Sequence, residues 1–77
     1  AGGGISGALQ KGASGDEVKT LQQFLISRGV LGSGSATGYF GSLTEAAVKK
    51  FQAEVGLEQV GIVGPITREK IKALQGQ

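Results

Sequence analysis

Residues 37–52 read TGYFGSLTEAAVKKFQ, and residues 60–75 repeat the same pattern as VGIVGPITREKIKALQ. The two segments align without a gap: each has the form G-x-Φ-G-x-x-T, where Φ is apolar, followed by a helical pattern that ends in V/I-K-x-Φ-Q. Residues 14–22 carry a third, shorter echo. Two units of about 23 residues are too few for a solenoid. The repeat therefore predicts an all-α fold, a compact three-helix bundle with glycine-rich loops.

The first helix is expected at residues 15–28. Ser14 and Glu17 have the S-x-x-E spacing of a capping box, in which the serine is the N-cap and the glutamate reaches back to it. Gly29 follows, at the position where a left-handed residue commonly ends a helix.

The second and third helices are expected from similar signals. The second should begin near Ser42 or Thr44, where Ser42 and Glu45 form another apparent capping box, and it should end at Gly56. Pro65 marks the start of the third helix, because proline at the first helical position loses no hydrogen bond that the helix would make.

Apolar residues recur at helical spacing in all three segments, which indicates one buried face for each helix. Phe40 is expected to pin the intervening loop to the same core. The expected helical core residues are Val18, Leu21, Phe24, Leu25, Leu43, Ala47, Phe51, Val55, Ile66, Ile71 and Leu74.

Length and composition restrict the function. Seventy-seven residues allow one domain: residues 1–8 are expected to be a flexible glycine-rich linker or tag remnant, and residues 9–75 the folded domain. The sequence contains no cysteine and no histidine. We therefore expect no thiolate or imidazole metal site, no cofactor and no Ser-His catalytic residues. No apolar run approaches the roughly 20 residues of a membrane span, so no membrane partner is expected.

Three phrases together resemble the peptidoglycan-binding domain type 1 of bacterial wall hydrolases. They are LQKGASGDEVKTLQ at residues 9–22, GYFGSLTEAAVKKFQ at residues 38–52 and VGIVGPIT at residues 60–67. The resemblance covers nearly the whole chain, with the phrases in the family's order. It implies a three-helix bundle with a ligand groove on one face.

The resemblance also implies a function. The expected role is a non-catalytic module, monomeric and linked to another domain, that anchors a larger exported protein to peptidoglycan in the cell wall or periplasm. The bound part of peptidoglycan would be the glycan or the stem peptide. The alternatives are a small basic nucleic-acid-binding module and a protein-docking module. Nucleic acid is disfavoured, because the net charge is only +2 and acidic residues are interspersed among the basic ones.

A groove for peptidoglycan needs amides, hydroxyls, an aromatic ring and a cation. The candidate ligand-binding residues are Tyr39, Gln22, Gln23, Arg28, Thr44 and Gln52. Arg28 could meet a stem-peptide carboxylate as a bidentate donor. Other roles remain open for four of them: Tyr39 as a loop cover, Thr44 as a helix-start hydroxyl, and Gln22 and Gln52 as ties between helix and loop. Gln75 occupies the same repeated position and could be a tie as well.

Overall fold

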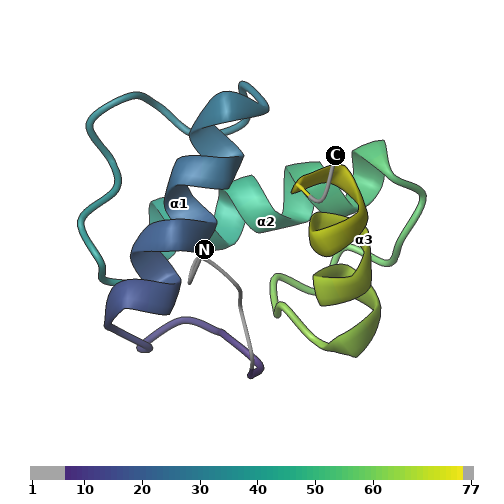
Figure 1. The fold of residues 1–77 in the computed structure, drawn as a ribbon, viewed down its shortest axis with the longest axis horizontal. Helices are drawn as coiled ribbons and strands as arrows, with labels where there is room; N and C mark the ends of the chain where they lie inside the picture. The colour runs from purple at the N-terminus through teal and green to yellow at the C-terminus, as the bar shows by residue number, and fades with distance from the viewer. Residues whose placement is uncertain (1–6, 76–77) are drawn as a thin grey trace.

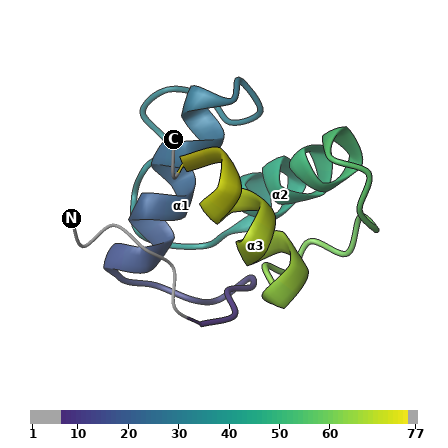
Figure 2. The same cartoon turned by 45° about the vertical axis from the view of Figure 1, so that its right-hand side comes forward.

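The computed structural model describes residues 7–75, in which three helices follow one another: α1 (Asp16–Ser27), α2 (Ser42–Glu54) and α3 (Pro65–Gln75). In Figure 1, α1 and α3 stand on either side of the molecule and α2 crosses behind them. Figure 2 shows α3 in front of α2 after a 45° turn. The predicted all-α fold is confirmed.

The core lies where the three helices meet. Phe24 of α1 and Phe51 of α2 pack edge to face, with ring centroids 5.2 Å apart. Phe40, from the loop before α2, is fully buried, as the sequence predicted. The buried apolar residues are Leu9, Val18, Leu21, Phe24, Leu25, Leu31, Phe40, Ala47, Val48, Phe51, Val63 and Ile71.

Two isolated antiparallel bridges fasten the loops to one another. Leu9 and Val63 exchange both backbone hydrogen bonds, at 3.1 and 2.8 Å, and Ser14 is bridged to Tyr39. The buried Leu9 is thus part of the domain. The predicted linker at residues 1–8 falls mostly outside the described residues, so it stays a prediction.

The Gln22 side chain holds the loop before α2 in place. Its amide nitrogen donates to the Tyr39 carbonyl oxygen at 2.8 Å and to the Thr44 hydroxyl at 2.9 Å. Its amide oxygen accepts the Gly38 backbone N–H at 2.8 Å. One buried amide therefore fixes the loop and the first turn of α2 together.

Gln52 repeats this arrangement one unit later. It donates to the Ile62 carbonyl oxygen at 2.9 Å and to the Thr67 hydroxyl at 3.1 Å, and it accepts the Gly61 N–H at 3.0 Å. Gln22 and Gln52 are each 1% exposed. We call them the glutamine clamps. They give the sequence repeat its physical meaning, because the same residue in each unit makes the same three bonds.

The structure corrects part of the predicted core. Leu43, Ile66 and Leu74 are 74%, 65% and 41% exposed, although the periodicity had placed them inside. Thr44 and Thr67 are buried instead, at 3% and 5%. Each clamp bonds a threonine hydroxyl and so turns that threonine inward. The buried face at the start of α2 and of α3 therefore begins one residue later in the chain than the periodicity predicted.

The predicted capping boxes are wrong. The N-caps are Gly15 and Gly41, and neither helix start has a side-chain cap bond. Ser14 lies in the bridge with Tyr39, and the Gly15 N–H bonds the Gly38 carbonyl oxygen at 2.9 Å, which delays the start of α1 to Asp16. Ser42 is the first residue of α2 and not its cap.

The predicted helix ends are confirmed. Gly29 and Gly56, directly after the C-caps of α1 and α2, both have φ of 80°. An L-residue rarely adopts this left-handed conformation, which explains glycine at both positions.

Replacing a clamp should destabilise the fold strongly. Gln52→Leu leaves a carbonyl oxygen, a hydroxyl and an N–H without their partner, and each buried unpaired group costs about 1–3 kcal/mol. We expect urea denaturation to show a loss of roughly 2–4 kcal/mol, since the loop will relax in part. Gln59→Leu, at an exposed glutamine, should change the free energy of unfolding by less than about 0.5 kcal/mol. Equal effects of the two substitutions would contradict a structural role for the clamp.

Candidate functional site

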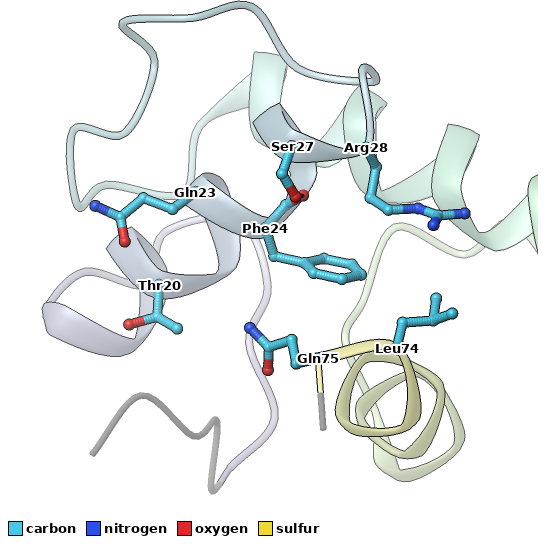
Figure 3. Close-up of a pocket in the computed structure, with 7 residues that line it drawn as sticks. All are labelled: Thr20, Gln23, Phe24, Ser27, Arg28, Leu74 and Gln75. Carbon is cyan, nitrogen blue, oxygen red and sulfur yellow. Dashed lines mark hydrogen bonds between the residues drawn. The ribbon is translucent and has the colours of Figure 1, made fainter. Parts of the chain in front are cut away.

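Two hollows on the surface are candidate ligand sites. The first, which we call the α1–α3 groove, has a volume of about 450 Å³. It is lined by Thr20, Gln23, Phe24, Ser27, Arg28, Leu74 and Gln75. Figure 3 shows the Phe24 ring projecting from α1 toward the end of α3, with Arg28 and Gln75 on opposite sides of it.

The α1 wall of this groove is polar because of helical spacing. Thr20, Gln23 and Ser27 lie three and four residues apart and so share one face of α1. Phe24, which is 7% exposed, belongs to both the core and the groove. The wall thus presents hydroxyl and amide groups above an aromatic side chain that the core holds rigidly.

Arg28 is the only charged residue among the described residues that line the groove. It lies at the C-cap of α1, where a cation also suits the helix dipole. One guanidinium nitrogen is 4.0 Å from a Glu54 carboxylate oxygen, and the two side chains are 37% and 47% exposed. An exposed pair at this distance contributes at most about 1 kcal/mol, so a ligand carboxylate can compete for Arg28.

The second hollow, which we call the Tyr39 hollow, lies between the loop after α1 and the first turn of α2. It has a volume of about 320 Å³ and is lined by Gln22, Gly34, Ser35, Thr37, Tyr39, Gly41, Ser42, Leu43 and Thr44. None of these described residues is charged. The hollow combines hydroxyl groups with the half-exposed Tyr39 ring and the exposed Leu43.

The structure separates the residues that the sequence suggested as one site. Gln23 and Arg28 line the α1–α3 groove, whereas Tyr39, Gln22 and Thr44 line the Tyr39 hollow. Gln22 and Gln23 are adjacent, but successive helical residues point about 100° apart. One is therefore directed inward as a clamp, and the other is exposed in the groove.

Three of the suggested residues are buried and make structural hydrogen bonds. Gln22, Gln52 and Thr44 are at most 3% exposed, and their side chains bond other parts of the chain. Gln52 lines neither hollow. The alternative of a helix-to-loop tie is thus confirmed for both Gln22 and Gln52, and Thr44 is a buried hydroxyl at the start of α2.

Sequence reasoning missed other groove residues. Thr20 and Ser27 share the spacing of Gln23 on α1, and that polar stripe was a usable signal. Leu74 and Gln75 were assigned to the core and to a repeated tie. Only the folded chain places the end of α3 against α1.

Groups of three or more metal-ligating side chains do not occur within residues 7–75. In the same range, no helix combines the length and apolar character that crossing a bilayer requires.

Comparison with known proteins identifies the family. The family model described as "Putative peptidoglycan binding domain" matches residues 14–71. The chain belongs to the peptidoglycan-binding domain family. The match covers α1, α2 and the first part of α3, and it includes both glutamine clamps.

In the curated relatives, the segment that matches this chain is only a part of a longer protein. The chain is 44% identical over 73 residues to zinc D-Ala-D-Ala carboxypeptidase of Streptomyces albus G, covering 91% of the chain and 28% of that protein. It is 42% identical over 67 residues to the N-acetylmuramoyl-L-alanine amidase CwlL of Bacillus licheniformis, covering 86% and 19%. The chain thus spans less than a third of either enzyme.

Solved structures of similar domains have the same fold. The SleB N-terminal domain superposes with a TM-score of 0.81 at 34% identity, covering 87% of this chain and 90% of that one. A peptidoglycan-binding protein from Clostridioides difficile, crystallised in complex with glutamine hydroxamate, gives a TM-score of 0.81 at 38% identity, covering 91% and 43%. Family and fold together support the peptidoglycan-binding domain and not the nucleic-acid or protein-docking alternatives.

The Arg28–Glu54 pair should be dispensable for folding. Glu54→Gln removes an exposed partner 4.0 Å away, so we expect the free energy of unfolding to change by less than about 1 kcal/mol. Guanidinium denaturation of this variant measures the change directly. A loss above about 2 kcal/mol would mean that the pair is structural and that Arg28 is not available to a ligand.

Proposed function

We propose that this chain is a non-catalytic module that holds a larger, exported, wall-acting protein on peptidoglycan, and that the α1–α3 groove receives the stem peptide. The family match supports the target. The observation that carries the site is Arg28, an exposed guanidinium beside amide and hydroxyl groups and above the Phe24 ring.

The chemistry of a stem peptide matches this lining. Stem peptides carry amides along their backbone and carboxylates at their ends, and a guanidinium binds a carboxylate through two parallel hydrogen bonds. Gln23 and Gln75 can donate to and accept from peptide groups. The apolar carbons of Phe24 and Leu74 provide contact area for alanine methyl groups.

A catalytic role finds no support in the same residues. The chain lacks histidine and cysteine, and among residues 7–75 no aspartate or glutamate lines either hollow. Hydrolysis of a glycosidic bond by the usual mechanism needs two carboxyl groups that face each other across the substrate. We infer that catalysis belongs to another domain of the parent protein, as the names of the relatives suggest.

Tethering would then act by effective concentration. A module that binds the wall keeps a linked catalytic domain near its insoluble substrate, even if the single contact is weak. This mechanism places the protein outside the cytoplasm, in the cell wall or periplasm.

Cosedimentation with purified sacculi tests the proposed function. Teichoic acid is removed from the sacculi first, so that polyphosphate cannot act as the ligand. We expect the 77-residue domain to leave the supernatant at both low and moderate salt, because groove contacts resist screening better than diffuse surface charge does. Failure of the folded domain to sediment at either salt would contradict the proposal.

Charge substitutions test the groove. Arg28→Gln should weaken sacculus binding by at least about tenfold, since a charge-assisted hydrogen bond contributes about 1.5–3 kcal/mol and about 1.4 kcal/mol is a factor of ten. Lys50→Gln removes the same charge at an exposed residue that lines neither hollow, and it should leave binding unchanged.

Glu54→Gln should strengthen binding about two- to threefold, because it frees Arg28 from a competing carboxylate. Binding isotherms for the wild type, Arg28→Gln, Lys50→Gln and Glu54→Gln compare the four affinities for sacculi. Equal losses for Arg28→Gln and Lys50→Gln would assign the effect to net charge and overturn the groove.

A further inference from the structure

We propose that the Tyr39 hollow is a second subsite, which binds a neutral acetamido sugar of the glycan strand. This inference rests on the proposed function, since it takes peptidoglycan as the ligand. It adds a separate surface with a different chemistry from that of the α1–α3 groove.

The absence of charge selects the ligand class. No charged side chain lines the Tyr39 hollow among the described residues, so a charged ligand group placed there would lose water without gaining an ion-pair partner. An N-acetylated hexosamine carries hydroxyl groups, an amide and apolar C–H faces, but no charge. Hydroxyl-bearing residues such as Ser35 and Ser42 match its polar edge.

The Tyr39 ring is held ready for such a contact. It is 55% exposed, and it rests against Gly41, where an added Cβ would lie 3.3 Å from the ring atom Cε2. A tyrosine ring offers an apolar face to C–H groups and a hydroxyl to the solvent side. The contact with Gly41 restricts the positions open to the ring, which lowers the side-chain entropy lost on binding.

The first turn of α2 adds backbone donors at the same place. No side chain caps this helix start, and its residues Ser42, Leu43 and Thr44 line the hollow. The first N–H groups of a helix have no partner within the helix. An acetamido carbonyl oxygen is a suitable acceptor for them.

The second unit of the repeat provides an internal comparison. Ile62 stands where Tyr39 stands in the first unit and is 42% exposed, so the position is open in both. The second unit lacks the aromatic ring, and an added Cβ at Gly64, the counterpart of Gly41, would meet nothing within 4 Å. The backbone is thus similar in the two units, but only the first has an exposed aromatic ring lying against the glycine.

Titration with a soluble oligomer of N-acetylglucosamine, followed by ¹⁵N–¹H correlation spectra, tests the subsite. We expect saturable shifts at the backbone amides of Ser35, Tyr39 and Leu43, with the amides of Arg28 and Gln75 unmoved. Tyr39→Ala should weaken the affinity at least tenfold. Ile62→Ala, the matched change in the other unit, should leave it within twofold.

Gly41→Ala supplies a milder probe. The residue has φ of −105°, which alanine adopts without strain, so its effect comes from pushing the Tyr39 ring. We expect a severalfold loss of saccharide affinity, whereas Gly64→Ala should have none. The same spectra show whether each variant is folded.

The outcomes separate the two proposals. Wild-type domain that sediments with sacculi but shows no saturable shifts with the saccharide overturns the subsite and leaves the proposed function standing. Saccharide-induced shifts confined to the α1–α3 groove, or equal losses from Tyr39→Ala and Ile62→Ala, also overturn it. Failure to sediment with sacculi overturns the proposed function itself.

Discussion

A buried glutamine that bonds the next loop and the next helix is the interaction on which this domain depends. Gln22 and Gln52 each satisfy a backbone N–H, a backbone carbonyl and a threonine hydroxyl. Two isolated bridges pair only part of the loop backbone in this small all-α chain, and unpaired buried groups are costly. In both units a buried glutamine supplies the missing hydrogen-bond partners of the loop backbone, and each of the two glutamines is 1% exposed.

The clamps also determine which surface is left for binding. Because Gln22 is directed inward, its neighbour Gln23 is exposed in the α1–α3 groove. Because Thr44 is bonded inward, Leu43 remains on the surface beside Tyr39. The same hydrogen bonds that fold the chain thus leave one face of α1 exposed in the α1–α3 groove and the start of α2 exposed in the Tyr39 hollow.

The sequence predicted much of this fold because the repeat, the helix-ending glycines and Pro65 each report local backbone geometry. It failed where a tertiary bond outweighs local preference. The serines at positions 14 and 42 have cap spacing, yet the N-caps are Gly15 and Gly41. Ser14 is instead paired with Tyr39 in a bridge, and α2 begins at Ser42 itself, within the predicted range. Periodicity placed Leu43 and Ile66 inside, although a polar threonine next to each takes the buried position.

The candidate site was predictable in its residue types but not in its arrangement. Tyr39, Gln23 and Arg28 follow from the chemistry that peptidoglycan requires. Their division between two hollows depends on where α3 packs and on the inward direction of Gln22, neither of which a single sequence reveals. Gln22 and Gln52 looked like ligand contacts because amides suit both a ligand and an internal loop.

The most direct measurement is a ¹⁵N–¹H titration of the domain with a soluble disaccharide-peptide released from peptidoglycan, which carries both chemistries in one molecule. The account predicts saturable shifts both in the α1–α3 groove, around Arg28, and in the Tyr39 hollow. The backbone amide signals of Gly38 and Gly61, which donate to the clamps, should remain visible because the fold is unchanged. Absence of saturable shifts, or shifts confined to surfaces away from both hollows, would contradict it.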